Sequence, residues 1–146
     1  MKKINILLII VSMVMFSCSN PLDSDSYSLT ELKIYEEVDC SGVGYATTCT
    51  DSSGAILELE QLACVAENYF WTNYFASLYD SIENSSFGGT FYEIDNTCEI
   101  EYEYISSGES VHLEGVYQQD GDSLTTCTVP NNTFINGNCT QFIFTK

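Results

Sequence analysis

The segment from Cys98 to Ile105 constrains the fold most, because polar and apolar residues alternate from Cys98 to Tyr104. Glutamates take every second position, and a cysteine, an isoleucine and two tyrosines take the others: Glu99, Glu101 and Glu103 alternate with Cys98, Ile100, Tyr102 and Tyr104. Successive side chains of a β-strand point to opposite faces. The pattern therefore predicts a strand with one face in water and the other face in a core.

Further short strands are expected on both sides of this segment, separated by turn residues. Residues 91–94 would pair with it across Asp95 and Asn96, and Asp120 and Gly121 would form a later hairpin turn. The other expected strands are residues 31–38, 44–50, 111–118, 124–129, 133–135 and 139–145, the first two joined at Ser41 and Gly42. Strands at this spacing predict a mainly β fold, an antiparallel meander that forms a small barrel or half-barrel.

The sequence pattern changes between residues 51 and 86, where apolar residues recur at steps of three and four. The recurring positions are Ile56, Leu59, Leu62, Ala66, Phe70, Tyr74, Leu78 and Ile82. This period predicts one long helix or two short ones over about residues 55–84, packed against the sheet. The aromatic cluster in this segment, which comprises Tyr69, Phe70, Trp71, Tyr74 and Phe75, is expected to pack on the sheet in preference to forming a ligand site.

Six of the seven cysteines follow residue 18: Cys40, Cys49, Cys64, Cys98, Cys127 and Cys139. An even set can pair fully in an oxidising compartment, in any of fifteen ways. Cys40 and Cys49 flank one expected hairpin turn, and Cys127 and Cys139 flank another. Cys64 and Cys98 would then form the third disulfide. A zinc site is the alternative, but the chain has no Cys-x-x-Cys pair and only one histidine, His112.

The N-terminal residues have the pattern of an export signal. Lys2 and Lys3 precede an apolar run at residues 4–16 that is too short to span a bilayer, and the small Ser17 precedes Cys18. Residues 15–18, Met-Phe-Ser-Cys, resemble the lipobox of bacterial lipoproteins, in which the cysteine is acylated and becomes the first residue of the mature protein. An ordinary cleaved signal peptide is the alternative.

The lipobox resemblance implies three regions in the chain. Residues 1–17 would be the lipoprotein signal peptide, residues 18–28 a solvated tether lipidated at Cys18, and residues 29–146 the β domain. Ser19 and Asn20 follow the cysteine, and the absence of Asp at that place resembles the signal for transfer to the outer membrane. We therefore expect an exported protein that a lipid, such as palmitate, anchors at the cell envelope.

The charge of the chain excludes several classes of partner. It carries 21 acidic residues and four lysines, with a formal net charge of −17 at pH 7, and beyond Cys18 the basic residues are Lys33 and Lys146. Such a surface repels phosphate, so the sequence excludes nucleic acid and a polybasic lipid-binding patch. A neutral, cationic or cation-bridged partner is compatible with it, as is a surface charge that only serves solubility.

No catalytic or cofactor motif is evident in the chain, and we expect no catalytic residue, cofactor or metal site. Glu99, Glu101 and Glu103 follow one another at steps of about 7 Å along a strand, a separation that the two catalytic carboxylates of a glycosidase can have. A strand face in contact with water explains these glutamates as well. His112 is expected as an incidental strand residue. Asp120 and Asp122, or Glu93 and Asp95, could bind calcium. The alternative interpretation is that each pair belongs to a polar hairpin turn.

Three short segments resemble the small bacterial lipocalin-like lipoproteins. Residues 35–42 (YEEVDCSG) resemble the early strand and turn of that family, and residues 87–91 (FGGTF) resemble the start of its central strand. Residues 115–124, with Gly-Val-Tyr followed by Gly-Asp-Ser-Leu, resemble its Gly-x-Trp hairpin. The resemblance implies an antiparallel barrel-like domain tethered to the envelope. It supplies no catalytic residues, and it suggests lipid or small-molecule binding by analogy.

Three functional hypotheses follow. The first is a non-enzymatic outer-membrane lipoprotein that binds a small apolar ligand or an envelope partner, with a concave interior lined by Tyr102, Tyr104, Tyr117, Phe142 and Phe144. The second is an envelope hydrolase that acts on glycans through the carboxylates of the acidic strand. The third is a purely structural surface domain with a filled core. The sequence leaves the oligomeric state open.

Overall fold

The computed structural model describes residues 26–131 and 138–146, which form two antiparallel sheets and two short helices. The larger sheet has six strands: β1 (Ser28–Tyr35), β5 (Gly88–Tyr92), β6 (Thr97–Glu103), β7 (Ser110–Asp120), β8 (Leu124–Pro130) and β9 (Cys139–Thr145). The smaller sheet has three: β2 (Thr47–Thr50), β3 (Ile56–Leu57) and β4 (Phe70–Asn73). The helices are α2 (Gln61–Ala66) and α3 (Tyr74–Tyr79). The expected mainly β fold is confirmed.

The larger sheet is the predicted meander with one strand added. Its order is β1-β9-β8-β7-β6-β5, so each strand from β5 to β9 pairs with the next one in the chain. The hairpin at Asp120 and Gly121 joins β7 to β8 as expected, and Gly121 has the positive φ that favours glycine in such turns. The expected strand at residues 133–135 lies outside the described residues, as do the expected signal peptide and Cys18.

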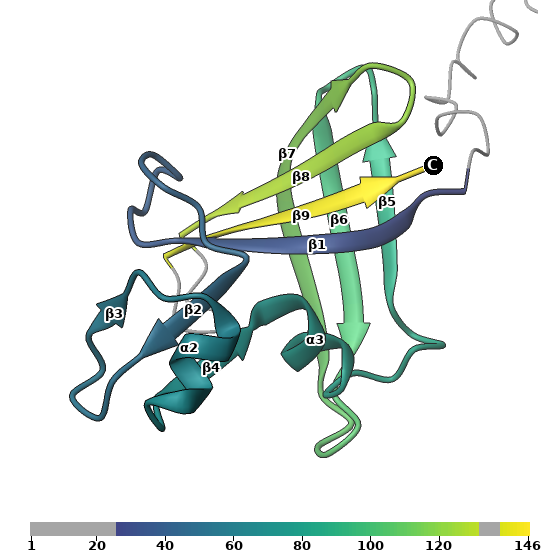
Figure 1. Cartoon of the computed structure of the whole chain (residues 1–146). Helices are drawn as coiled ribbons and strands as arrows, with labels where there is room; N and C mark the ends of the chain where they lie inside the picture. The colour runs from purple at the N-terminus through teal and green to yellow at the C-terminus, as the bar shows by residue number, and fades with distance from the viewer. Residues whose placement is uncertain (1–25, 132–137) are drawn as a thin grey trace, which may run out of the picture.

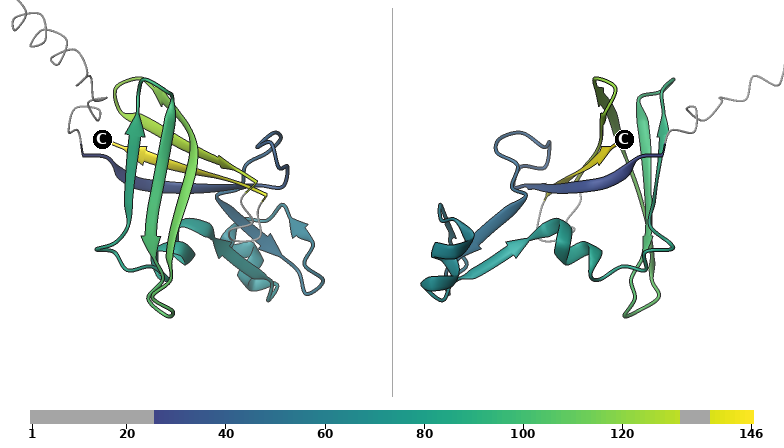
Figure 2. Two further views of the ribbon diagram at one scale, coloured as in Figure 1. Left: turned by 180° about the vertical axis from the view of Figure 1, so that it is seen from behind. Right: turned by 45° about the vertical axis from the view of Figure 1, so that its right-hand side comes forward.

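The larger sheet curves strongly, so that β5, β6 and β7 run across the direction of β1, β8 and β9 (Figures 1 and 2). Its concave side holds the core, to which Leu32 of β1, Ile100 of β6 and Phe142 of β9 contribute fully buried side chains. Within the described residues, β1 and β5 form the two edges of the sheet, and no pairing between these edges closes it into a barrel.

The alternation along the acidic strand is confirmed. Cys98, Ile100 and Tyr102 of β6 are buried, whereas Glu99, Glu101 and Glu103 lie on the other face and are at least partly exposed. The ladder with β7 places Glu101 opposite His112. The outer face of β6 and β7 is therefore polar, as the periodicity of two predicts.

The expected hairpin between the first two strands is wrong. β1 pairs with β9 instead, and β2 belongs to the smaller sheet, with a single bridge between Ile34 and Tyr45 left from the expected pairing. Pairing with β9 brings Leu32 and Ile34 into the core beside Phe142. This burial of apolar area stabilises the distant pairing over the local one. β1 begins at Ser28, so the last residue of the expected tether is part of the sheet.

The helical prediction for residues 55–84 is correct for two short stretches, α2 and α3, and wrong elsewhere: Ile56–Leu57 form β3, Phe70–Asn73 form β4, and Ile82 is bridged to Tyr104. Asn68 adopts a left-handed conformation (φ 58°) just after α2, and the Tyr69 amide donates a hydrogen bond to the Cys64 carbonyl. The chain then continues as β4, which pairs with β2, so that Trp71 lies opposite Cys49. The Asn73 side chain caps α3 by accepting a hydrogen bond from the Ala76 amide at 3.0 Å.

All six cysteines beyond residue 18 are paired, but each of the three predicted pairings is wrong. The disulfides are Cys40–Cys139, Cys49–Cys64 and Cys98–Cys127. The predicted Cys40–Cys49 pairing assumed that β1 and β2 form a hairpin, and the predicted Cys127–Cys139 pairing assumed that the turn between β8 and β9 brings these two cysteines together. β8 and β9 do pair, but their register places Cys127 opposite Phe142 and Cys139 opposite Pro130. Because β1 pairs with β9 instead, Cys40 after the end of β1 lies beside Cys139 at the start of β9. Cys98 and Cys127 come from β6 and β8, on either side of β7.

Candidate functional site

A cleft of about 330 Å³ lies where the start of β1, helix α3 and the start of β5 come together. Its lining is mainly aromatic and aliphatic: Tyr27, Leu29, Phe75, Leu78, Tyr79, Ile82, Phe87 and Phe144, with Ser28, Gly88 and Gly89. None of these lining residues carries a charged side chain. Small-molecule sites are typically concave, mostly apolar and about 300–1,000 Å³ in volume, so the cleft is at the small end of that range.

Helix α3 supplies one wall of the cleft through side chains at helical spacing. Phe75 and Tyr79 lie one turn apart, with ring centroids 5.7 Å from each other, and Leu78 between them is buried in the core. Tyr79 is half exposed, so its ring forms the rim of the cleft. The period of three and four in the sequence includes Leu78 but not Phe75 or Tyr79, so the sequence did not identify this wall of the cleft.

The aromatic floor of the cleft depends on the absence of a side chain at Gly89. A Cβ built at Gly89 would lie 3.0 Å from the Phe144 ring, which is closer than ordinary van der Waals contact. Phe144 also packs edge-on against Phe91 at 5.1 Å between centroids, so this ring is held from the β5 side as well. Glycine at this position therefore leaves room for the aromatic floor of the cleft.

Of the five residues expected to line a ligand site, Phe144 is the one that lines this cleft. Tyr102, Tyr117 and Phe142 are buried in the core, and Tyr104 packs against it. Burial raises the pKa of the Tyr102 and Tyr117 hydroxyls, since the ionised form would lose its hydration. Side chains therefore fill the concave face of the sheet at these positions, and the hollow lies beside α3 at the edge.

The carboxylates considered for glycan hydrolysis lie on the outer face of β6. The side chain of Glu101 is 69% exposed, and Glu99 and Glu103 are partly exposed, so water reaches all three. This environment suits an ionised carboxylate, whereas a general acid of a glycosidase needs a desolvated carboxyl that stays protonated. The pairs considered for calcium, Asp120 with Asp122 and Glu93 with Asp95, lie exposed at hairpin turns.

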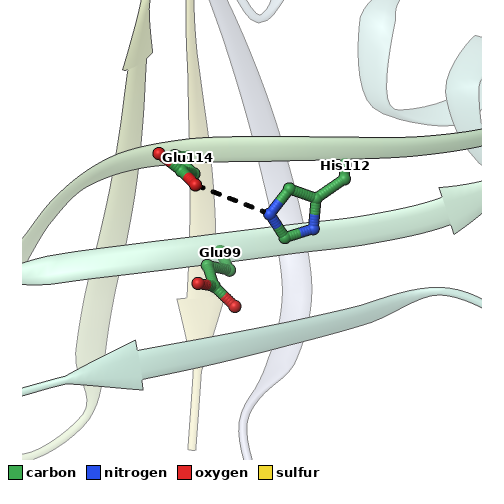
Figure 3. Close-up of side chains that lie close together, drawn as sticks. All are labelled: Glu99, His112 and Glu114. Carbon is green, nitrogen blue, oxygen red and sulfur yellow. Dashed lines mark ion pairs between the residues drawn. The ribbon is translucent and has the colours of Figure 1, made fainter.

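His112 and three glutamates form a compact cluster on this outer face. The imidazole Nδ1 lies 3.1 Å from Glu101 Oε1. Its Nε2 lies 3.8 Å from Glu114 Oε1, and Figure 3 shows this pair with Glu99 nearby. Glu99, opposite Glu114 in the ladder, accepts a hydrogen bond from the Tyr92 hydroxyl at 3.0 Å. That bond to the carboxylate is the main reason why the pKa of Tyr92 is raised. Sequence reasoning treated His112 as incidental, because the strand register that surrounds it with carboxylates was not known.

The described residues, 26–131 and 138–146, contain no helix long and apolar enough to cross a membrane. Comparisons of the chain with protein-family models, with curated proteins and with solved structures find no match.

Proposed function

We propose that this chain is a non-enzymatic lipoprotein of the bacterial envelope whose β domain binds a small apolar ligand at the cleft between β1, α3 and β5. The observation that carries the proposal is the uncharged, largely aromatic lining of this cleft. We further propose that the curved sheet is a half-barrel of lipocalin-like type, with α3 beside its open edge. In this arrangement the ligand occupies the edge of the half-barrel, because the interior is already filled by aromatic side chains.

The charge of the protein restricts the ligand further. A net charge of −17 disfavours an anionic molecule, and the cleft offers an anion no basic side chain among its lining residues. Burial of apolar surface contributes roughly 25 cal/mol per Å², so an apolar ligand gains affinity here from contact area alone. The ligand is therefore a neutral, mainly hydrocarbon or aromatic molecule.

The position of the cleft in the chain suits a membrane-derived ligand. Tyr27, Ser28 and Leu29 line the cleft, and Ser28 is ten residues from Cys18. Ten residues reach at most roughly 33–36 Å when fully extended. A lipid anchor at Cys18 would thus hold the cleft within one bilayer thickness of the membrane surface, where apolar molecules are concentrated.

Acylation of Cys18 predicts a clear result in cells fed a palmitate analogue. The wild-type chain should incorporate the label and lose residues 1–17, whereas Cys18→Ala should incorporate none and retain residues 1–17, because the lipoprotein signal is cut only before an acylated cysteine. Gel fluorescence and intact mass measure the two effects. Ser19→Ala serves as the control and should be labelled normally. A Cys18→Ala chain that is cut and released would instead indicate an ordinary signal peptide.

Ligand binding at the cleft predicts that filling it lowers affinity. Leu29 is half-buried and lines the cleft, so Leu29→Trp should occupy part of the hollow and weaken binding of the neutral fluorescent probe N-phenyl-1-naphthylamine at least tenfold. A form beginning at Ser19, which carries no acyl chain, suits this titration. Leu62→Trp is the matched control, since Leu62 is 87% exposed on α2 and does not line the cleft. Equal affinity in both variants would contradict the proposed site.

A structural surface domain is the second candidate, and the filled interior favours it. Phe142 and Tyr102 are almost fully buried on the concave face, where a binding cup would leave space. Native mass spectrometry of the oxidised form beginning at Ser19 separates the two candidates. A co-purified apolar molecule supports the binding function. A ligand-free protein that also fails to bind the probe supports the structural one.

A further inference from the structure

We propose that Glu99, His112 and Glu114 bind a divalent transition-metal ion, with zinc as the probe, on the outer face of β6 and β7. One ligand atom from each of these residues lies within 4.8 Å of the others. The set differs from an ordinary acidic surface because it contains an imidazole, the side chain that most commonly binds zinc, copper and nickel. His112 is the single histidine of the chain, and it lies within this group of carboxylates.

The strand register creates the cluster. Glu99 lies opposite Glu114, and Glu101 lies opposite His112, so that four polar side chains share one face of two adjacent strands. Like charges directly opposite each other in an antiparallel ladder are destabilising. Lys33 and Lys146 are the basic residues beyond Cys18, and the described ion pairs of this cluster involve only His112. A bound cation would relieve the repulsion between Glu99 and Glu114.

The distance between His112 and Glu114 is compatible with a shared ion, and small side-chain rotations would bring all three ligand atoms, which lie within 4.8 Å of one another, onto it. Two atoms bound to one zinc ion at about 2.1 Å lie about 3.4 Å apart at the tetrahedral angle and at most about 4.2 Å apart. The 3.8 Å from His112 Nε2 to Glu114 Oε1 falls within that limit, and it exceeds the length of a hydrogen bond. The Glu114 side chain is 80% exposed, so its rotation can bring it closer at little cost.

Two neighbouring groups orient the ligands. Glu101 Oε1 lies 3.1 Å from His112 Nδ1, a distance that suits a hydrogen bond donated by the imidazole. This bond leaves Nε2, which lies 3.8 Å from Glu114 Oε1, as the nitrogen available to the metal. The Tyr92 hydroxyl donates to Glu99 Oε2 and leaves the other oxygen of that carboxylate available. Metal-binding histidines commonly donate their second ring N–H to a carboxylate, and such partners typically change metal affinity 10- to 100-fold. The three protein ligands would leave a coordination position for water.

The test is a zinc titration of the purified full-length chain, monitored by competition with a fluorescent chelator. We expect one zinc ion per chain and at least a tenfold loss of affinity in His112→Gln, Glu99→Gln and Glu114→Gln. Glu103→Gln is the matched control, because Glu103 lies on the same strand and the same face, removes the same charge and is not part of the cluster. It should change zinc affinity less than twofold.

A second measurement uses the unaltered protein. Because His112 is the only histidine, the ring ¹⁵N spectrum contains one imidazole, and zinc should shift its Nε2 resonance more than its Nδ1 resonance. Two outcomes would overturn the proposal. One is unchanged zinc affinity in His112→Gln together with an unshifted imidazole. The other is an equal loss of affinity in Glu103→Gln, which would indicate diffuse adsorption of cations on an acidic surface.

Discussion

Phe142→Ala is expected to lower the free energy of unfolding by about 3–5 kcal/mol, as large-to-small substitutions of buried phenylalanines do. Phe142 is fully buried on β9, where it lies between Leu32 of β1 and Cys127 of β8 in the two flanking ladders. Alanine would leave a cavity in the core beside β1 and β8. Since domains of this size are stable by only about 5–15 kcal/mol, the loss is a large part of the total. Urea denaturation monitored by circular dichroism measures it.

Phe70→Ala is the matched control for this substitution. Phe70 is 64% exposed on β4 of the smaller sheet, so truncating it removes little buried area, and we expect a change within about 1 kcal/mol. Similar losses in the two variants would contradict the arrangement of strands in which β9 lies at the centre of the concave core.

Removing the Cys40–Cys139 disulfide should cost about 4.7 kcal/mol, while removing Cys49–Cys64 should cost about 3 kcal/mol. The first disulfide joins residues 99 positions apart and the second joins residues 15 positions apart, so the first restricts the unfolded chain more. Double alanine variants measured in urea under non-reducing conditions give the two values. The order of the two losses is the critical result, and a larger loss in the Cys49/Cys64 variant would contradict the pairing.

Peptide mapping of the non-reduced protein tests the same pairing directly. Chymotrypsin can cut after Tyr45, which separates Cys40 from Cys49, and after Phe134, which separates Cys127 from Cys139. A linked peptide that joins Cys40 to Cys139 is the expected product. A peptide that joins Cys40 to Cys49 would instead support the hairpin predicted from the sequence, and it would show that the pairing of β1 with β9 is wrong.

Local sequence patterns predicted the elements whose partners are adjacent in the chain. The alternation along β6 identified its buried and exposed faces, and the Asp120–Gly121 turn identified the β7–β8 hairpin. Both signals come from a few consecutive residues. The helical period identified Tyr74 and Leu78 of α3 in the same way, but not Phe75 and Tyr79, which line the cleft with β1 and β5.

The sequence patterns did not predict the features that depend on contacts between residues far apart in the chain. Nothing near β1 indicates that it pairs with β9, more than 100 residues later, and this error gave Cys40 the wrong disulfide partner. The register of β8 and β9, which separates Cys127 from Cys139, was not predicted either. The apolar period across residues 55–84 continued through β4, because Phe70 fits a helical period as well as a strand. Here pairing with β2 decided the conformation.

The sequence by itself determined the mainly β class, the polar outer face of β6, the acidic surface and an even set of cysteines able to form disulfides. The tertiary structure decided which strands pair, which cysteines bond, and where residues from β1, α3 and β5 enclose a cleft. It also decided that His112 lies among three glutamates. The physical reason is that periodicity and turn residues act within a few positions, whereas burial of apolar area is a property of the whole chain.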